Sequence, residues 1–395
     1  MSNVKFFAKT IFNLHRPIIK NTVLFRSFYG QYNDSPKYIS EELHRRAPDV
    51  NIIWTIRDGK QTDFPSYVKL VKLDSPEYIK YIARAEVVVD NYTGCRSSIS
   101  TSKNLVRRIV FRLASKKRKG QYNLSTWHGT PLKHIALDEP QYKNASYVKP
   151  YFATDIILSD SKLTTGAFKT AFNWGSKPLL ECGMPRNDIF FEQQSGELKE
   201  KLGLPKDKKV ILFAPTFRDS VEMSGLKQVK ELNIKGLLES LSNKFGGEWC
   251  FAFRCHGNVM ASVLKDSALD SQLIINGNAH PDMAEYLACV DVLLTDYSSC
   301  MFDYMYSKKP CFLYVPDLES YKNSERGFYF DIEETPFDIC KDEASLIDAI
   351  KSYDEKEYLA KREEFIAKLG KFENGTASKV AVDLILQKLT VKGVK

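Results

Sequence analysis

Four stretches of the chain place hydroxyl, guanidinium and imidazole groups directly after runs that are typical of β-strands. A fifth stretch places Arg326 beside Gly327, where the missing side chain lets a phosphate approach closely. Such groups bind anions by hydrogen bonds and positive charge, and an imidazole also exchanges a proton near neutral pH. The five stretches cover residues 125–133, 213–219, 251–257, 291–299 and 325–331.

His128 is the candidate general base. It lies at the end of a short β-type run, and Gly129 and Pro131 force a turn after it. A histidine at the carboxyl end of a strand can face a cleft, and its ordinary pKa of about 6.5 suits proton removal at neutral pH. The alternative, for this residue alone, is a structural histidine bonded to a backbone carbonyl.

Residues 213–219 and 291–299 predict an anion site. Thr216 can donate one hydrogen bond, and Arg218 can clamp a phosphate with two. Ser298 and Ser299 follow a strand-like run and begin a helix, where free backbone N–H groups and the helix dipole attract anions. Plain helix capping by Ser298 is the alternative. Neither GxxxxGK[ST] nor GxGxxG occurs, which argues against a P-loop ATPase and a standard dinucleotide site.

We expect no metal site. Cys255 and His256 are adjacent, so on a strand they would point to opposite faces, which is poor geometry for a chelate. No cluster of carboxylates suggests a metal centre elsewhere. The hydroxyl, Arg and His groups fit a pocket that holds a pyrophosphate, with His128 across a cleft as base. That pocket fits a transferase with a nucleotide-diphospho donor.

From about residue 49 the chain alternates between β-rich runs and amphipathic stretches, which is typical of a doubly wound α/β protein with parallel sheets. A polar connector within 186–209 indicates a domain boundary near residue 190, and 376–389 indicates a closing helix. The expected strands are 51–56, 67–71, 86–90, 156–159, 178–182, 210–215, 249–255, 273–275, 290–295 and 311–315. The expected helices include 76–83, 162–172, 234–245, 283–289 and 299–306.

The positive charge is concentrated in two short segments. Residues 1–30 and 102–120 together hold 13 basic residues and no acidic one, whereas the remaining chain has 44 basic against 49 acidic residues. Both segments carry apolar residues at helical spacing, a pattern that suits an anionic membrane surface. A solvated charged face is the alternative, and a nucleic-acid groove is disfavoured because aromatic residues are not interleaved. The membrane candidates are Lys5, Lys9, Arg107, Arg108, Arg112, Lys116 and Lys117.

Composition excludes several classes of protein. The 395 residues are 43% hydrophobic and 27% charged, as in folded globular proteins rather than disordered chains or rods. No apolar run approaches the ~20 residues of a spanning helix, and no signal peptide is expected. The eight cysteines are scattered without a CxxC pair, so neither a disulfide scaffold nor a zinc ribbon is expected, and a reducing cytoplasm fits better.

Several of these stretches occur in an order that resembles the CDP-glycerol glycerophosphotransferase family of teichoic acid primases, polymerases and related capsule enzymes. The resemblance is carried by WHGTPLK at 127–133, APTFRD at 214–219, 291–299 and 326–331. It extends to YNDSPK at 32–37, GMPRND at 183–188 and FENGTAS at 372–378. One departure is Gly257, where many members have proline after the second histidine.

The resemblance implies a GT-B-like fold: two doubly wound, Rossmann-like α/β domains that face a central cleft. The expected organisation is a basic membrane-associating segment at 1–30, an acceptor-side domain at 31–190 that contains 102–120, a CDP-donor domain at 191–375 and a closing helix at 376–395. It further implies a peripheral enzyme on the cytoplasmic face of the membrane. Its acceptor would be lipid-linked or a growing polymer, and the donor a CDP-alditol, with no further cofactor required.

The resemblance also implies roles for individual residues. His128 would deprotonate the acceptor hydroxyl, and His256 would act at the pyrophosphate. The other donor-side candidates, which would hold the phosphates, orient the loops or meet the alditol, are Thr216, Arg218, Arg254, Asp296, Ser298, Ser299, Asp303 and Arg326. Two alternatives stay open: a GT-B glycosyltransferase with a nucleotide-sugar donor, and a non-enzymatic protein that binds polyanions or membranes. Glycerol or ribitol, primase or polymerase, the acceptor and the oligomeric state stay undetermined.

Overall fold

The computed structural model describes residues 8, 11–57, 64–91, 105–142, 153–192, 196–216, 225–255, 273–324 and 327–389. The chain divides into two compact units. The first unit comprises residues 1–128, 136–188 and 372–395, and the second comprises 129–135 and 189–371. These units differ from the expected ranges in three segments, because 129–135 and 189–190 join the second unit and 372–375 joins the first.

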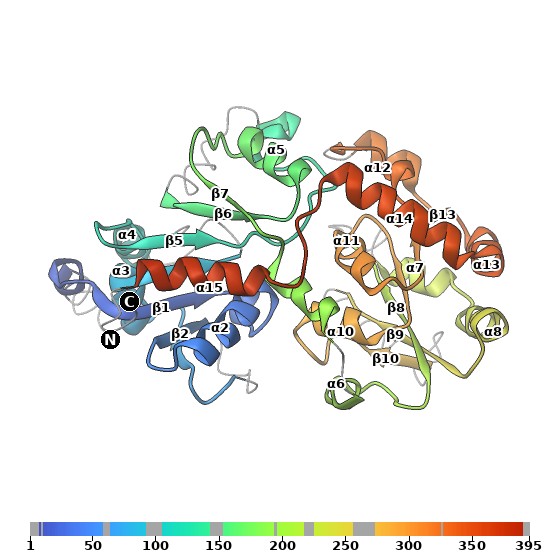
Figure 1. Ribbon diagram of the computed structural model, residues 1–395, viewed down its shortest axis with the longest axis horizontal. Helices are drawn as coiled ribbons and strands as arrows, with labels where there is room; N and C mark the ends of the chain where they lie inside the picture. Colours follow the sequence, from blue (N-terminus) through green and yellow to red (C-terminus); the bar gives the residue numbers. More distant parts are fainter. Residues whose placement is uncertain are drawn as a thin grey trace. The chain divides into compact units, whose positions relative to one another are not determined.

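Within the described residues of the first unit, seven strands form one sheet in the order β3-β2-β1-β4-β5-β6-β7 (Figure 1). All neighbouring strands pair in parallel. The strands are β1 (Ile19–Arg26), β2 (Asn51–Ile56), β3 (Lys69–Lys72), β4 (Ala85–Asp90), β5 (Tyr122–Ser125), β6 (Ile156–Ser159) and β7 (Leu179–Glu181). The order reverses direction between β1 and β4, and such a switch point is where doubly wound sheets bind ligands.

Strand β1 corrects the expected membrane-associating segment 1–30. Residues 19–26 form a central strand of the sheet, in which Val23, Leu24 and Phe25 are completely buried. A run rich in β-branched and aromatic residues favours a buried parallel strand, and helical spacing among earlier residues does not extend into it. The basic Lys20 beside this run pairs with the buried Glu86 of β4 at 3.0 Å.

Helices cover both faces of the first sheet. The helical elements are η1 (Phe28–Gly30), α2 (Asp34–Arg46), α3 (Pro76–Arg84), α4 (Leu105–Ala114), η2 (Ala136–Asp138), η3 (Pro140–Tyr142), α5 (Lys162–Ala171) and α15 (Ala377–Lys388). Element η5 (Pro185–Phe191) carries the chain into the second unit. Local sequence starts these helices: Ser75 accepts a hydrogen bond from the backbone of Tyr78, and Pro76 occupies the first turn of α3.

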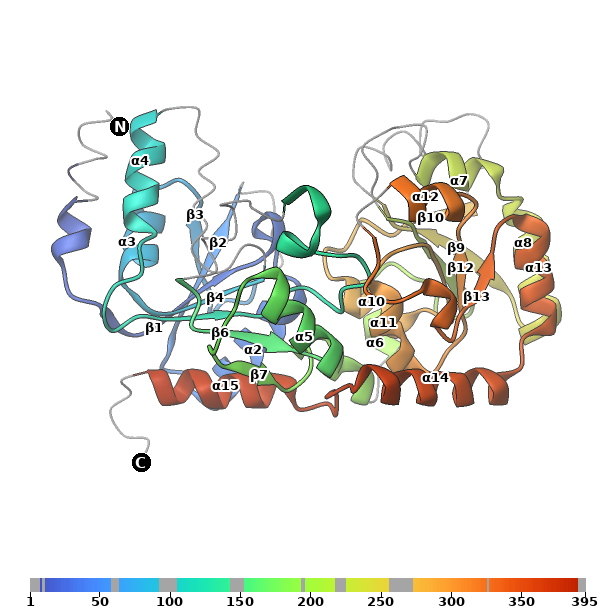
Figure 2. The same cartoon turned by 90° about the horizontal axis from the view of Figure 1, so that it is seen from above.

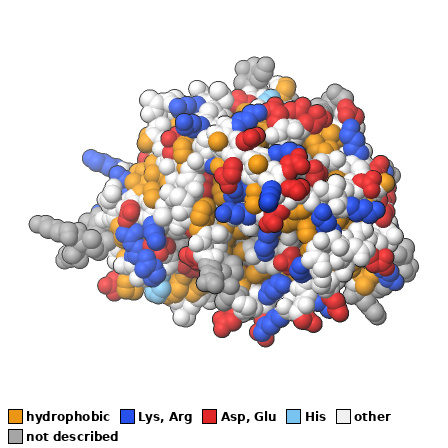
Figure 3. Space-filling model, turned by 45° about the vertical axis from the view of Figure 1, so that its right-hand side comes forward, with side chains coloured by type: hydrophobic (Ala, Val, Ile, Leu, Met, Phe, Trp, Pro, Cys, Tyr) orange, Lys and Arg blue, Asp and Glu red, His pale blue; other side chains and the backbone are white. Residues whose placement is uncertain are grey.

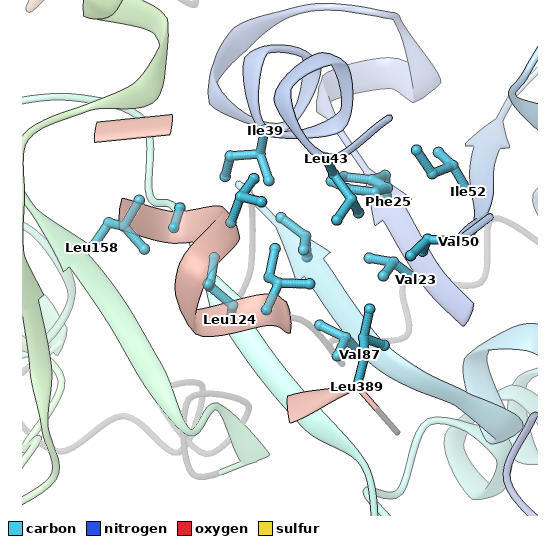
Figure 4. Packing of buried hydrophobic residues seen from close by; sticks show 14 of the residues in the cluster. Val23, Phe25, Ile39, Leu43, Val50, Ile52, Val87, Leu124, Leu158 and Leu389 are labelled. Atoms are coloured by element: carbon cyan, nitrogen blue, oxygen red, sulfur yellow. The ribbon is translucent and has the colours of Figure 1, made fainter. Parts of the chain in front are cut away.

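Alternating residues of each strand supply two cores. Val23, Phe25 and Val87 pack with α2 and the last helix, α15, as Figure 4 shows from close by. Leu24 and Val88, their neighbours on the strands, pack with α3 and α4 on the opposite face. Figure 2 shows these two helix layers on either side of the first sheet. The predicted closing helix therefore packs into the core of the first unit, although residues 189–371, which precede it in the chain, belong to the second unit.

The second unit repeats the arrangement. Within its described residues, six parallel strands form a sheet in the order β10-β9-β8-β11-β12-β13. The strands are β8 (Lys209–Ala214), β9 (Trp249–Phe253), β10 (Ile274–Asn276), β11 (Val292–Thr295), β12 (Cys311–Tyr314) and β13 (Asp338–Cys340). The direction of the order reverses between β8 and β11, which places a second switch point there.

The helices of the second unit are α6 (Gly196–Lys201), α7 (Gly225–Glu231), α8 (Ile234–Phe245), α10 (Met283–Cys289), α11 (Cys300–Tyr304), η8 (Met305–Ser307), α12 (Leu318–Ser324), η9 (Ile332–Glu334), α13 (Glu343–Ser352) and α14 (Glu355–Leu369). Helices α8 and α13 pack with Phe213, Phe251 and Phe312 of the sheet in one core. Elsewhere in the unit, Phe302 of α11 and Phe365 of α14 stack with ring centroids 6.1 Å apart.

Candidate active site

His128 follows strand β5 by three residues, as the sequence predicted for a residue at a strand's carboxyl end. Its neighbour Trp127 has a left-handed backbone with φ of 55°, which turns the chain sharply before the histidine. The indole of Trp127 stacks on the imidazole at 3.9 Å between centroids, and the edge of Phe28 approaches the imidazole at 5.3 Å. The ring is thus held between aromatic side chains.

The hydrogen bond of His128 fixes its tautomer. Its Nδ1 lies 3.0 Å from the backbone carbonyl of Asn91, the residue that follows β4. A carbonyl oxygen can only accept, so Nδ1 carries the proton and the neutral ring keeps its lone pair on Nε2. Burial is the largest influence on the ring and lowers the pKa of His128 below its ordinary value of 6.5. The sequence analysis gave a bond between His128 and a backbone carbonyl as the structural alternative, and the structure contains that bond. Because the bond uses Nδ1, the Nε2 atom can still accept a proton.

Three residues that the sequence analysis did not single out surround His128. Asp34 begins α2, Asn91 follows β4, and Arg186 lies in η5. The guanidinium of Arg186 donates to Asp34 and to the backbone carbonyl of His128, both at 3.0 Å. Two of them lie within stretches, 32–37 and 183–188, that carried the family resemblance. The family resemblance of these two stretches is therefore the feature of the sequence that could have indicated Asp34 and Arg186.

The switch point of the second unit holds Thr216 and Asp296. Both the backbone N–H and the hydroxyl of Thr216 donate to one carboxylate oxygen of Asp296, at 2.7 and 2.5 Å. Asp296 is completely buried and directly follows β11, while Thr216 follows β8. The two candidates are therefore brought together across neighbouring strands, in an arrangement where the carboxylate orients the Thr216 loop.

Arg254 follows β9 and donates its hydrogen bonds to backbone carbonyls. One terminal nitrogen bonds Gly277 and His280 at 2.5 and 2.6 Å, and the other bonds Pro281 at 2.8 Å. Its guanidinium also lies over the ring of Tyr286. These contacts hold the loop after β10 and favour a positioning role for Arg254 over the phosphate contact expected from sequence.

Ser298, Ser299 and Asp303 lie around the start of α11. Ser298 accepts a long hydrogen bond from the backbone of Cys300 at 3.5 Å, but the N-cap residue of α11 is Ser299, whose side chain makes no capping bond. Both serines are half-buried, and Asp303 is buried within the helix. Whether they meet a donor stays a prediction.

Residues 129–135, which follow His128, pair with 327–329 inside the second unit. Lys133 and Phe328 form an antiparallel bridge, and His134 donates its backbone N–H to Gly327 at 2.9 Å. Gly327 has a φ of 79°, and a Cβ there would meet the His134 ring at 3.1 Å. The positive φ therefore favours glycine here, and a side chain would in addition press against the His134 ring.

Several candidates lie outside the described residues: His256, Arg218, Arg326, Lys5 and Lys9. Arg107 belongs to α4, but its side chain is not among those that the structure describes. The remaining basic candidates Arg108, Arg112, Lys116 and Lys117 are exposed or lie at the end of α4. Lys117 forms an ion pair with Asp155.

The exposed side of α4 combines these cations with apolar side chains. Leu105 is 66% exposed and Ile109 is 48% exposed, while Val110 and Phe111 of the same helix are buried in the core. The predicted amphipathic helix is present, and its surface carries both apolar and basic groups. Among the described residues, no helix is long and apolar enough to cross a membrane.

Comparison with known proteins identifies related chains. The sequence model for "CDP-Glycerol:Poly(glycerophosphate) glycerophosphotransferase" matches residues 8–387. A teichoic acid poly(glycerol phosphate) polymerase of Staphylococcus epidermidis is 31% identical over 92% of this chain and 50% of its own length. A polymerase of the same name from Bacillus spizizenii is 32% identical over 94% of this chain and 93% of its own length. The chain thus spans about half the length of the first relative and nearly all of the second.

Solved structures agree with the predicted fold class. A structure of the wall teichoic acid polymerase TagF has a TM-score of 0.80 at 28% identity and covers 97% of this chain and 94% of its own. A TagF variant soaked with CDPG has a TM-score of 0.77 at 27% identity, covering 98% of this chain and 93% of its own. The expected GT-B-like class, with two doubly wound α/β units, is confirmed.

Proposed function

The chain belongs to the CDP-glycerol:poly(glycerophosphate) glycerophosphotransferase family, and from this premise we propose that it transfers glycerol phosphate from CDP-glycerol to a hydroxyl group of a teichoic acid chain, releasing CMP. The observation that carries the proposal is the tautomer of His128 in a chain of this family. Its Nε2 lone pair and lowered pKa make it a neutral base at physiological pH.

In the proposed reaction, Nε2 of His128 removes the proton of the acceptor hydroxyl. The acceptor oxygen then forms a bond to the β-phosphorus of the donor, and the bond from that phosphorus to the bridging oxygen breaks. The electron pair leaves with CMP, and His256 stabilises or protonates the leaving phosphate. His128 contributes by making the oxygen nucleophilic only when it is placed for attack, which is the usual benefit of general base catalysis.

We assign the donor to the second unit. Its switch point between β8 and β11 is where a doubly wound sheet binds its ligand, and Thr216 and Asp296 meet there. Ser298 and Ser299 lie on the same loop as Asp296, and Arg218 follows Thr216 by two residues. Hydroxyl groups, backbone N–H groups and a guanidinium bind a pyrophosphate without a metal ligand set.

We further propose that the enzyme works at the cytoplasmic face of the membrane, attached peripherally, on a lipid-linked or polymeric acceptor. The exposed Leu105 and Ile109 beside Arg108 and Arg112 support this, because apolar groups enter the interface while cations pair with anionic headgroups. Transfer to a capsular polymer instead of teichoic acid would use the same chemistry with a different acceptor.

The test is CMP release by purified protein supplied with CDP-glycerol, CDP-ribitol or UDP-glucose and a membrane fraction as acceptor source. Release of CMP from CDP-glycerol alone supports the proposal. Release of CMP from CDP-ribitol alone would keep the reaction class and change the alditol. Release of UDP alone would overturn the proposal in favour of a GT-B glycosyltransferase. A synthetic lipid-linked glycerol phosphate acceptor replaces the membrane fraction when no donor is consumed.

A further inference from the structure

Four residues of the first unit form a closed ring of hydrogen bonds around the imidazole of His128. The Nδ1–H of His128 donates to the backbone carbonyl of Asn91 at 3.0 Å. The side-chain amide of Asn91 donates to Asp34 at 2.5 Å. Arg186 then bonds the other carboxylate oxygen of Asp34 and the carbonyl of His128, both at 3.0 Å. The histidine is therefore held by its ring and by its own backbone.

The sequence builds this ring from four separate segments. Asp34 adopts a left-handed backbone with φ of 58°, which non-glycine residues rarely adopt, and its carboxylate also accepts from the backbone of Ser35 at 2.7 Å. Asn91 also donates to Ser27, at 3.1 Å, so the ring joins the ends of β1 and β4 at the switch point. Asp34 and Asn91 are buried, which makes their mutual bonds costly to break.

We propose that Asp34, Asn91 and Arg186 are positioning residues, which hold His128 in the Nδ1–H tautomer and aim Nε2 at the acceptor hydroxyl. The role of His128 as a base rests on the proposed function, whereas the orientation of its imidazole by these three residues does not. None of the three needs to touch substrate to act in this way. Fixing one tautomer through a bond at the other ring nitrogen is how proteins commonly orient a working histidine.

The ring also balances charge around the imidazole. Asp34 of α2 and Asp90 of β4 raise the pKa of His128, and Arg186 lowers it, while burial lowers it most. Asp90 forms an ion pair with Arg26 of β1 at 3.4 Å, and Phe28 and Trp127 present uncharged rings. Removing the Arg186 charge takes away an effect that lowers the pKa of His128, whereas removing the Asp34 charge takes away one that raises it. The two changes should therefore move the pKa of His128 in opposite directions.

The first experiment needs neither donor nor acceptor. Long-range proton–nitrogen NMR of the full chain reports the tautomer and titration of each histidine, with the His128 signal assigned by its loss in His128→Gln. We expect Arg186→Gln to raise the pKa of His128 and Asp34→Asn to lower it. Asn91→Ala should weaken the preference for the Nδ1–H tautomer. Arg45→Gln, which removes an exposed cation paired with Glu42 on α2, is the control and should leave His128 unchanged.

The second experiment follows kcat/KM against pH with CDP-glycerol. Arg186→Gln should lose activity near neutral pH and recover it as the pH rises, whereas Asp34→Asn should shift the acidic limb to lower pH. Misplacement of the base lowers kcat by about 10²-fold with little change in the KM for donor. Arg186→Lys keeps the positive charge and should restore the wild-type acidic limb, even where Arg186→Gln folds poorly.

Opposite shifts of the His128 pKa support the proposal, since a merely structural role would move both variants alike or neither. The same pKa and tautomer of His128 as in the wild type, in folded Asp34→Asn and in folded Arg186→Gln, would overturn it. If the wild-type protein consumes no CDP-glycerol while the NMR shifts hold, the proposed function fails and the hold on His128 stands.

Discussion

His128 shows how a residue acquires a chemical role from its surroundings. A histidine bonded to a carbonyl is often structural, yet here the bond occupies Nδ1 and leaves Nε2 with a lone pair. Burial disfavours the imidazolium and lowers the pKa of His128 from its ordinary value of 6.5. The neutral ring is therefore available as a base at physiological pH without a partner carboxylate on Nδ1.

The lowered pKa of His128 predicts a pH profile. Because the neutral ring is the active form, kcat/KM should stay constant on the acidic side of neutrality and fall only below pH 6.5, as His128 takes up a proton. Initial rates of CMP release in buffers of constant ionic strength measure this limb. A limb with its midpoint above 6.5 that persists with a second acceptor would contradict the placement of His128 as the essential base.

Removal of the imidazole predicts a large loss of turnover. His128→Gln keeps an amide that can donate to the Asn91 carbonyl but has no group that takes a proton, so kcat should fall by at least about 10²-fold. His44→Gln is the matched control, since the ring of His44 only stacks on Tyr67. Wild-type turnover in folded His128→Gln would remove His128 from the mechanism.

The pair of bonds from Thr216 to Asp296 predicts a defect in donor binding. Asp296→Ala removes the acceptor of both bonds, and a bond to a charged group contributes about 1.5–3 kcal/mol, which corresponds to about tenfold or more in affinity. We expect the KM for CDP-glycerol to rise by about that factor while kcat changes less. Asp338→Ala is the control, because Asp338 lies on the edge strand β13, two strands away from β11. An unchanged KM would show that the Thr216 loop does not serve the donor.

At the scale of elements, apolar patterning located most strands but not the first. Residues 51–56 and 156–159 match β2 and β6 as predicted, and 234–245 matches α8. Strand β1 was missed because its basic neighbours and the nearby helical spacing pointed to a surface segment, whereas burial of Val23 and Phe25 depends on strands far along the chain. A local sequence pattern does not show which distant strands will pair with β1.

The site was predictable to the same degree. Thr216, Asp296 and His128 were found because each follows a strand, and parallel strands end at one edge of a sheet. Asp34, Asn91 and Arg186 were not found, because their function lies in hydrogen bonds between segments up to 152 residues apart. The carbonyl groups that bind Arg254 could not be predicted either, because every residue has a backbone carbonyl and the residue type does not show which one accepts.

Helix α15 predicts how the end of the chain stabilises the first unit. Ile385 is completely buried among residues of the sheet and α2, so Ile385→Ala should lower the free energy of unfolding by about 2–5 kcal/mol. Gln387→Ala, on the exposed side of the same helix, should change it by less than about 0.5 kcal/mol.

Tryptophan fluorescence can follow that transition separately. Trp54, Trp127 and Trp174 belong to the first unit and Trp249 to the second, so a Trp249→Phe background reports the first unit during denaturant unfolding. Equal midpoints for Ile385→Ala and Gln387→Ala would mean that α15 adds nothing to the first core.

For the whole molecule, the placement of charge matters more than its sum. The net charge of +8 comes from residues 1–30 and 102–120, since the rest of the chain has more acidic than basic residues. Over the face shown in Figure 3, Lys and Arg side chains are interspersed with Asp and Glu. Basic residues of 1–30 are partly structural, since Lys20 pairs with Glu86. The cations at α4 are therefore the better candidates for an anionic surface.

This distribution predicts salt-sensitive binding to anionic vesicles through α4. Each basic residue near such a surface contributes about 1 kcal/mol, so reversing Arg108, Arg112 and Lys116 to Glu together should weaken binding by about 10²-fold or more. The control reverses three exposed lysines of the second unit, Lys230, Lys235 and Lys356, which changes the net charge equally. Sedimentation with phosphatidylserine vesicles at rising salt measures the affinity, and zwitterionic vesicles show what charge contributes. If both triple variants bind alike, net charge alone attracts the protein to the surface, and α4 is not its contact.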